Sequence, residues 1–306
     1  MNIFPINRRR FLKHSATAAA AISLAPGISL AADTAVKRTA VDQVTLGKTG
    51  IKLSRLGMGC GSNNGQLQTA LGREGFNKLV QYAYDQGITY FDCADNYRTF
   101  EILGAAIKPL PREKLFIQSK VTGTPDDVLA AIDHHRKTFD TDYVDSMLIH
   151  LMTRPGWTQE DSFKRIMDGF NQAVEKKWIR AKGVSCHTLP ALRAAVDSDW
   201  TEVHLVRVNP QGKHMDDEVT RETWDDASHK IEPVVEQLKK MRQKDRGVIG
   251  MKILGNNGFN SGEERDKSIR YAMSRPELNA IVIGFRAQSE IDEAIKRINN
   301  ALADAA

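Results

Sequence analysis

The sequence is poor in cysteine. Its 306 residues contain three, Cys60, Cys93 and Cys186, an odd number that cannot be fully paired in disulfides. Their spacing contains no CxxC motif, which argues against a zinc or iron–sulfur site. Cys60 and Cys186 also lie near the ends of strands that we expect on opposite sides of the fold, beyond the roughly 7 Å between Cα atoms that a disulfide tolerates. We therefore expect three small buried side chains and no metal site.

Long apolar runs, internal repeats and low-complexity tracts are missing from the sequence after residue 31. The absence of such runs argues against membrane-spanning helices in this part of the chain, and the absence of repeats argues against a solenoid. The composition, 41% hydrophobic and 26% charged, is ordinary for a soluble globular protein.

Acidic residues are missing from residues 1–31, which carry Arg8, Arg9, Arg10 and Lys13. The RRRFLK run fits the twin-arginine export pattern, and small residues around Ala31 suit a signal peptidase. We expect residues 1–31 to be a signal peptide read by the twin-arginine translocation machinery. The mature protein would then be periplasmic, with no stable membrane association. A basic amphipathic tail is the alternative.

Removal of this segment changes the charge balance. The remaining chain has 39 basic residues (43 minus 4) and 38 acidic ones, a net charge of +1. The high isoelectric point is therefore largely a property of the signal, and it gives no support for nucleic-acid binding. The remaining length, about 275 residues, suits one barrel of the usual ~250 residues. We expect residues 32–306 to form that single domain.

Short apolar runs alternate with helical patterns along this domain. The expected strands are Leu53–Gly59, Thr89–Asp92, Leu115–Ser119, Val144–Ile149, Ala181–Val184, Val203–Val208, Val248–Met251 and Ala280–Ile283. Helices are expected at Phe76–Gln86, Pro125–Phe139, Ser162–Lys176, Pro233–Gln243 and Ser289–Leu302, the last with Ser289 as its N-cap. Eight buried strands that alternate with helices predict a closed parallel (β/α)8 barrel, or TIM barrel.

Four polar residues stand at or just past the carboxyl ends of expected strands: Asp92, Tyr97, Lys120 and His150. Barrels of this kind build their active sites at that end. The set suggests proton transfer to a carbonyl oxygen, with Tyr97 as the acid. Lys120 would lower the phenol's pKa from its usual ~10, Asp92 would hold Lys120, and His150 would donate or orient at the same oxygen.

Four segments resemble the aldo-keto reductases in order and spacing: GITYFDCADNYRTFEILGAAI (Gly87–Ile107), REKLFIQSKV (Arg112–Val121), DYVDSMLIH (Asp142–His150) and WIRAKGVSCH (Trp178–His187). The opening, VTLGKTGIKLSRLGMGCGS (Val44–Ser62), is similar to bacterial members, in which a short β-hairpin closes the bottom of the barrel. The resemblance covers nearly all of residues 44–300. It implies an NAD(P)-dependent oxidoreductase that moves a hydride between nicotinamide and a small-molecule carbonyl or sugar-like alcohol.

The resemblance also places the nicotinamide end of the cofactor. Ser185 matches a residue that holds the carboxamide in the family. Cys186, Arg207 and Met251 stand where the family has an asparagine, a glutamine and a stacking aromatic residue. An arginine only donates, so it cannot accept from the carboxamide. A positive charge at Arg207 would disfavour the cationic oxidised nicotinamide, unless the guanidinium turns to an acid or to a substrate carboxylate.

At the phosphate end, Gly255 lies in ILGNNG (Ile253–Gly258), which resembles the family's pyrophosphate loop. Gly284-Phe285-Arg286 resembles the stretch that places a guanidinium on a 2′-phosphate, whereas Glu290 would repel that phosphate. NADP is therefore expected only somewhat ahead of NAD. Two further residues complete the expected cofactor contacts: Gly59 and Lys252.

A long irregular stretch, Asn209–Lys230, is expected to be a substrate-gating loop. Four of its residues allow a metal site as the alternative, although their spacing matches no metal motif: His214, Asp216, Asp217 and His229. A role for Cys186 and His187 at the barrel mouth also stays open. Two other functions remain possible for the whole chain. One is a non-redox enzyme that uses the same four residues for enolisation or elimination on a keto-sugar, and the other is a non-catalytic ligand-binding barrel.

Overall fold

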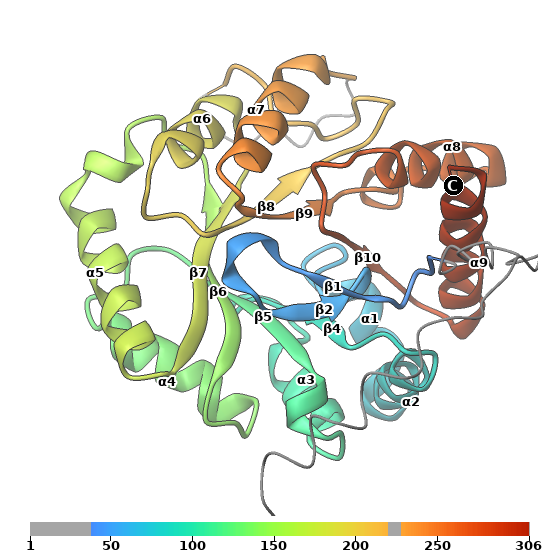
Figure 1. Cartoon of the computed structure of the whole chain (residues 1–306). Coiled ribbons are helices and arrows are strands. Elements are labelled where there is room, and N and C mark those ends of the chain that lie inside the picture. The colour runs from blue at the N-terminus through green and yellow to red at the C-terminus, as the bar shows by residue number, and fades with distance from the viewer. Residues whose placement is uncertain (1–37, 220–227, 306) are drawn as a thin grey trace, which may run out of the picture. The chain divides into compact units, whose positions relative to one another are not determined.

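The computed structural model describes residues 38–219 and 228–305. Parallel strands form a closed barrel in the order β10-β3-β4-β5-β6-β7-β8-β9, with helices around it (Figure 1). The barrel strands are β3 (Leu56–Gly59), β4 (Tyr90–Asp92), β5 (Phe116–Val121), β6 (Val144–Met152), β7 (Ile179–Cys186), β8 (Val203–Arg207), β9 (Gly247–Met251) and β10 (Ala280–Gly284). The predicted (β/α)8 fold is confirmed. The predicted signal peptide, residues 1–31, lies outside the described residues.

A hairpin of β1 (Gln43–Thr45) and β2 (Lys52–Ser54) precedes the barrel, and the two strands pair antiparallel. Its apolar residues Leu46 and Leu53 share a buried cluster with Tyr90 and Phe116, the first residues of β4 and β5. The hairpin therefore closes the amino-terminal end of the barrel, as expected.

The expected strand Leu53–Gly59 is wrong in one respect, because it divides at Arg55 into β2 and β3. The backbone N–H of Arg55 donates to the carbonyl of Asp42, at 3.0 Å, and that of Leu56 donates to the carbonyl of Ala40. These bonds turn the chain from the hairpin into the barrel.

The helices cover the outer surface of the barrel (Figure 1). They are α1 (Gln66–Thr69), α2 (Gly72–Asp85), α3 (Phe100–Ile107), α4 (Val128–Thr138), α5 (Asp161–Glu175), α6 (Leu189–Asp197), α7 (Glu232–Gln243), α8 (Gly262–Met273) and α9 (Gln288–Asp304). In α5, Phe163, Ile166 and Phe170 recur every three to four residues and are buried, the spacing that gives a helix one apolar face. None of the helices described here is long and apolar enough to cross a membrane.

The predicted N-cap of the last helix is wrong. Helix α9 begins at Gln288, and Ser289 lies inside it. The carboxylate of Glu290 reaches back instead and accepts the backbone N–H of Arg286, at 2.7 Å. Arg286 precedes the N-cap Ala287, so this bond ties the incoming chain to the first turn of the helix and does not replace a cap.

Side chains alternate between the two faces of each barrel strand. On β5, Ile117 and Val121 belong to the apolar cluster between strands and helices, whereas Phe116 belongs to the cluster inside the barrel. Lys120 is in register with Phe116 and points inward at the carboxyl end of the strand. The three cysteines are buried and free.

Candidate active site

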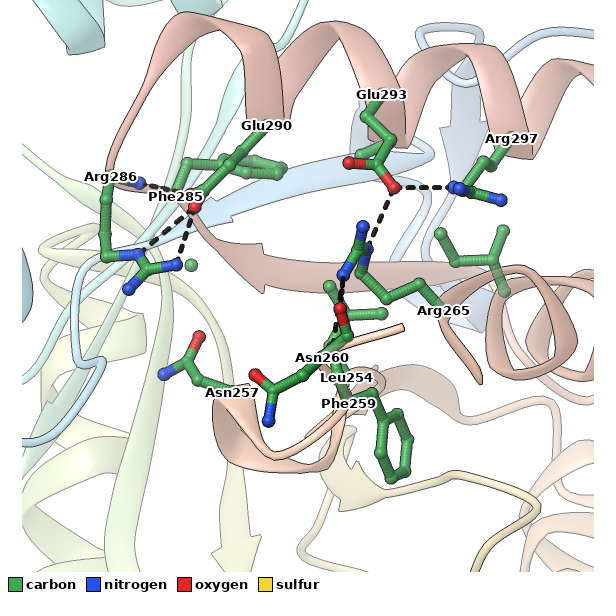
Figure 2. Close-up of a pocket in the computed structure, with 13 residues that line it drawn as sticks. Leu254, Asn257, Phe259, Asn260, Arg265, Phe285, Arg286, Glu290, Glu293 and Arg297 are labelled. Carbon is green, nitrogen blue, oxygen red and sulfur yellow. Dashed lines mark hydrogen bonds and ion pairs between the residues drawn. The ribbon is translucent and has the colours of Figure 1, made fainter. Parts of the chain in front are cut away.

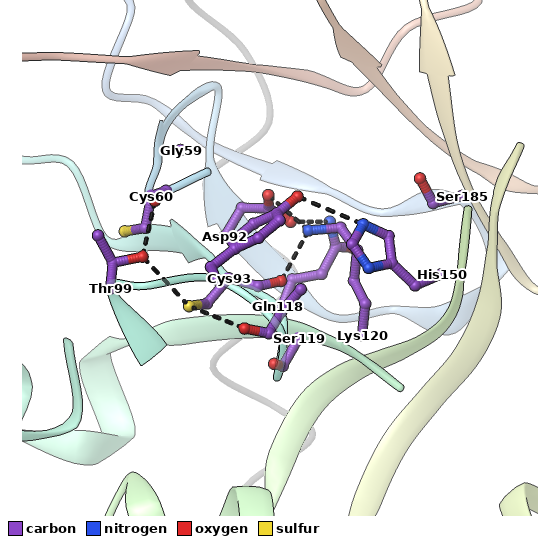
Figure 3. Close-up of polar contacts among 12 residues, drawn as sticks. Gly59, Cys60, Asp92, Cys93, Thr99, Gln118, Ser119, Lys120, His150 and Ser185 are labelled. Atoms are coloured by element: carbon purple, nitrogen blue, oxygen red, sulfur yellow. Dashed lines mark hydrogen bonds and ion pairs between the residues drawn. The ribbon is translucent and has the colours of Figure 1, made fainter. Parts of the chain in front are cut away.

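The four predicted residues meet at the carboxyl-terminal end of the barrel. The ammonium of Lys120 donates to Asp92 Oδ2 at 2.8 Å and to the carbonyl oxygen of Cys93 at 2.7 Å. It lies 5.0 Å from the centre of the Tyr97 ring, and Tyr97 Oη is 3.4 Å from His150 Nε2. Figure 3 shows Asp92, Lys120 and His150 converging from neighbouring strands.

Gly61 allows the Tyr97 ring to lie in this position. A Cβ atom at Gly61 would overlap the ring, so only glycine lets the tyrosine pack against the backbone that follows β3. The turn after β4 presents the ring, since the N–H of Tyr97 donates to the carbonyl of Ala94 at 3.1 Å. Gly61 was not among the predicted site residues, and its only signal was its place just after an expected strand.

Gln118 holds the carboxylate of Asp92 in place by a hydrogen bond. Its Nε2 atom donates to Asp92 Oδ1 and to the hydroxyl of Tyr90, each at 2.8 Å. Together with the bond from Lys120, this contact leaves both Asp92 oxygens engaged. The prediction also missed Gln118, although the two-residue period of β5 places it on the same inner face as Lys120.

The pKa of Tyr97 departs from the prediction. Burial raises it, the negative charge of Asp92 adds to the increase, and the ammonium of Lys120 lowers it, with a net result of about 12. Lys120 therefore acts in the predicted direction, but the predicted net decrease is wrong because burial outweighs it. Tyr97 is protonated at neutral pH and available as an acid.

Lys120 and His150 are both buried, but their neighbours leave Lys120 charged and His150 neutral. Burial disfavours the Lys120 ammonium, yet Asp92 and Tyr97 raise its pKa above the usual value, so it stays charged. For His150, burial and then the positive charge of Lys120 hold the pKa well below its usual range. The imidazole is therefore neutral and carries a single ring hydrogen.

A pocket opens beside this group, and several predicted cofactor residues line it together with Asp92 and Tyr97: Gly59, Met251, Lys252 and Gly284. A Cβ atom at Gly284 would overlap the hydroxyl of Ser62, so a side chain at this position would displace Ser62 from the pocket wall. Gly255 lies next to the pocket, at φ +57°, and starts a left-handed turn. The ammonium of Lys252 donates to Asn256 Oδ1 in this turn, at 2.9 Å. A glycine-rich turn with a lysine suits the pyrophosphate of a dinucleotide.

Arg286 and Glu290 lie in an adjoining pocket between α8 and α9 (Figure 2). The Arg286 guanidinium donates to Glu290 Oε1 at 2.8 and 3.1 Å. Arg265 and Arg297 both donate to Glu293 at 2.8 Å. Glu290 thus pairs with Arg286, a contact that the sequence did not predict, and it still places a negative charge where a 2′-phosphate is expected. Three arginines and two glutamates give the lining a net charge of +1.

The nicotinamide end differs most from the prediction. Arg207 is buried, and its Nη2 lies 2.5 Å from His187 Nδ1 while its Nε lies 3.5 Å from Asp216 Oδ1. The Ser185 hydroxyl lies 3.3 Å from His187 Nε2. Because the guanidinium turns to an acid, the condition for repelling oxidised nicotinamide is not met. Cys186 is buried in the apolar cluster toward the helices and does not join Ser185.

The structure bears on two alternatives that the sequence left open, a role for His187 at the barrel mouth and a metal site in the loop after β8. His187 does reach the barrel mouth, where its ring centre lies 6.3 Å from that of His150. The residues proposed for a metal separate, since Asp216 points to Arg207 and Asp217 pairs with His229 at 2.9 Å. In residues 38–219 and 228–305, no three His, Cys, Asp or Glu gather to hold a metal ion. The gating loop is described only in part, because residues 220–227 lie outside the description.

Fold and site define a (β/α)8 protein with a tyrosine, lysine, histidine and aspartate at the catalytic end. The model of the aldo/keto reductase family matches residues 55–298, well over half of the chain. The chain belongs to that family.

Two curated relatives are similar over shorter segments. A probable aldo-keto reductase 1 of Glycine max is 33% identical over 125 residues, 36% of each chain. An NAD/NADP-dependent indole-3-acetaldehyde reductase of Schizosaccharomyces pombe is 38% identical over 136 residues, 43% of this chain and 48% of that one. Both matches span less than half of the relative.

Solved structures show the same fold. A putative aldo-keto reductase of Pseudomonas aeruginosa has a TM-score of 0.68 at 20% identity, over 86% of this chain and 98% of that one. An aldo-keto reductase of Bacillus halodurans, solved in its holo form, has a TM-score of 0.67 at 13% identity, over 87% and 96% of the chains. At these identities the likeness concerns the fold alone.

Proposed function

We propose that this protein is an NAD(P)H-dependent oxidoreductase that transfers a hydride between nicotinamide and a carbonyl or sugar-like alcohol. One observation carries the proposal: the Tyr97 hydroxyl lies 3.4 Å from His150 Nε2, and the buried Lys120 ammonium lies 5.0 Å from the centre of the tyrosine ring. This arrangement places one transferable proton beside a fixed positive charge, the requirement for protonating a carbonyl oxygen that gains negative charge.

In the reduction, the carbonyl carbon gains a hydride, which nicotinamide supplies when bound, and the oxygen gains the proton of Tyr97. The Lys120 ammonium stabilises the phenolate that remains until solvent reprotonates it. Asp92 and Gln118 keep that ammonium in place. His150, being neutral, orients the oxygen atoms by hydrogen bonding and adds no further charge.

The proposed cofactor is NADP, with NAD also accepted. The glycines and Lys252 suit the pyrophosphate, and the net positive lining around Arg286 and Arg265 favours an additional phosphate. The name of the Schizosaccharomyces pombe relative, which includes both NAD and NADP, agrees with this breadth.

Glu290 tests this cofactor choice. Glu290→Gln removes one negative charge beside Arg286 and should tighten NADPH binding on the order of fivefold, since an exposed charge pair is worth up to about 1 kcal/mol. NADH binding should stay unchanged because NADH lacks the 2′-phosphate. Fluorescence titration of both cofactors measures the effect, with the exposed Glu263→Gln as control. Equal changes for NADPH and NADH would contradict a 2′-phosphate site here.

A second candidate is a non-redox reaction such as enolisation of a keto-sugar by the same four residues. The observation that favours it is the Arg207, His187 and Asp216 group, which takes up hydrogen-bonding groups at the expected carboxamide end. The same titrations separate the two candidates. A protein that binds neither NADPH nor NADH and still turns over a carbonyl substrate performs the non-redox reaction, and one that turns over none is a ligand-binding barrel.

We also propose that the protein reaches the periplasm through the twin-arginine route, which carries folded proteins. The support is the RRRFLK run at residues 8–13. Changing Arg8 and Arg9 to lysine keeps the charge and removes the twin-arginine signature, so the precursor should accumulate in the cytoplasm. Cell fractionation and immunoblotting measure this, and a Lys13→Arg variant serves as the control. An unchanged periplasmic yield of the double variant would refute the assignment.

A further inference from the structure

The ring of His150 has a second polar neighbour, Thr122, which directly follows β5. Thr122 Oγ1 lies 3.0 Å from His150 Nδ1, the ring nitrogen that faces away from Tyr97. The two nitrogens therefore have different partners, a threonine hydroxyl and a tyrosine hydroxyl. A neutral imidazole has one hydrogen, and the partner of one nitrogen decides which nitrogen carries it.

Thr122 is itself held in place. Its backbone N–H donates to Asp95 Oδ2, at 3.0 Å, across the gap between β5 and the turn after β4. Burial opposes the negative charge of Asp95, but the neighbouring His135 and hydrogen bonding by Thr122 lower its pKa to about 2. His135 Nε2 lies 3.8 Å from the same oxygen. Asp95 is thus a permanent carboxylate that fixes the backbone of Thr122 beside the histidine.

We propose that Thr122 fixes the tautomer of His150 by donating its hydroxyl hydrogen to Nδ1, so that Nε2 carries the ring hydrogen toward Tyr97. Thr122 is then a positioning residue, and this role rests on the proposed reaction. The Nε2 hydrogen bonds to the tyrosine oxygen, which leaves the hydrogen of Tyr97 directed to a carbonyl. The opposite tautomer would accept that hydrogen and turn it away from the substrate.

The negative charge that develops on the Tyr97 oxygen during the reaction favours this direction over the reverse. Tyr97 is protonated at neutral pH, so its oxygen has both a hydrogen to give and lone pairs to accept with. An N–H at Nε2 uses the lone pairs and becomes a stronger partner as the oxygen loses its proton. Both this bond and the Lys120 ammonium then stabilise the phenolate.

The test combines a spectroscopic readout with kinetics. In ¹⁵N-histidine-labelled protein, with the His150 signals assigned through a His150→Gln variant, the wild type and Thr122→Ser should show the Nε2–H tautomer. Thr122→Val, which has a similar shape and no hydroxyl, should shift the ring toward Nδ1–H. For metal-binding histidines, loss of the partner that orients the ring costs about 10- to 100-fold, and we take this as the scale for His150. We expect kcat to fall by that order in Thr122→Val, with KM for NADPH unchanged, and Thr122→Ser to recover most of it.

Thr45→Val, in the hairpin at the opposite end of the barrel, controls for a general effect of replacing threonine. An Nδ1–H tautomer in the wild type, or an unchanged Nε2–H tautomer in Thr122→Val, would overturn the proposal whatever the activity. The spectra need no turnover. A protein that shows the expected tautomers and reduces no carbonyl would therefore refute the proposed reaction and keep the assignment of Thr122.

Discussion

Tyr97→Phe is expected to lower kcat for carbonyl reduction on the order of 10² to 10⁴, the range typical of a lost general acid. The variant keeps the aromatic ring beside Gly61 and the Lys120 ammonium and removes the one transferable proton of the site. Cofactor binding should change little because the phenol contributes proton transfer in the transition state. Steady-state kinetics and a fluorescence titration of NADPH measure the two quantities.

The control for this variant is Tyr84→Phe, on the outer helix α2, which should retain full activity. If Tyr97→Phe reduced carbonyls at a near-normal rate, Tyr97 would not be the acid. Equal losses in kcat and in cofactor affinity would instead indicate that the phenylalanine disturbs the pocket.

Asp92→Asn is expected to destabilise the protein strongly. Lys120 is 1% exposed, and Asp92 is its charged partner at 2.8 Å. Removing one member of a buried ion pair typically costs about 3–5 kcal/mol, because the other charge stays buried and uncompensated. We expect a decrease of that size in the free energy of unfolding at pH 7, measured by urea denaturation.

The pH dependence of this loss has a definite sign. In the wild type, Asp92 raises the pKa of Lys120 above its unfolded value, so the stabilisation is present at neutral pH and is lost only as the pH rises through the folded-state pKa. In Asp92→Asn, burial without the carboxylate lowers the pKa of Lys120. The deficit should therefore shrink as the pH rises from neutral to about 10, near the unfolded pKa of lysine. A deficit that grows with pH, or one matched by the exposed Asp142→Asn, would contradict this account of the pair.

The barrel and the four central residues were predictable because their signals are local. A short apolar run locates each strand, the carboxyl end of a strand locates the active-site face, and Asp92, Lys120 and His150 stand at such ends. The resemblance to a family then supplied their roles. The fold follows from the alternation of strand and helix patterns along the sequence.

The supporting contacts were not predictable because they join residues from different elements. Gln118 meets Asp92, and Arg207 meets Asp216, only once the barrel closes and the loop after β8 folds inward. The pKa of Tyr97 failed for a related reason. The sequence names the neighbouring charges but not the degree of burial, and burial decides the net shift here.

Transfer of deuterium tests the central claim most directly. The purified protein is incubated with NADPH carrying deuterium at the transferable position of nicotinamide and with a panel of aldehydes, ketones and keto-sugars. The account predicts that at least one carbonyl carbon gains one deuterium for each NADPH oxidised, and that Tyr97→Phe loses this transfer. Binding of NADPH without deuterium in any product, or conversion of a substrate without oxidation of NADPH, would contradict it.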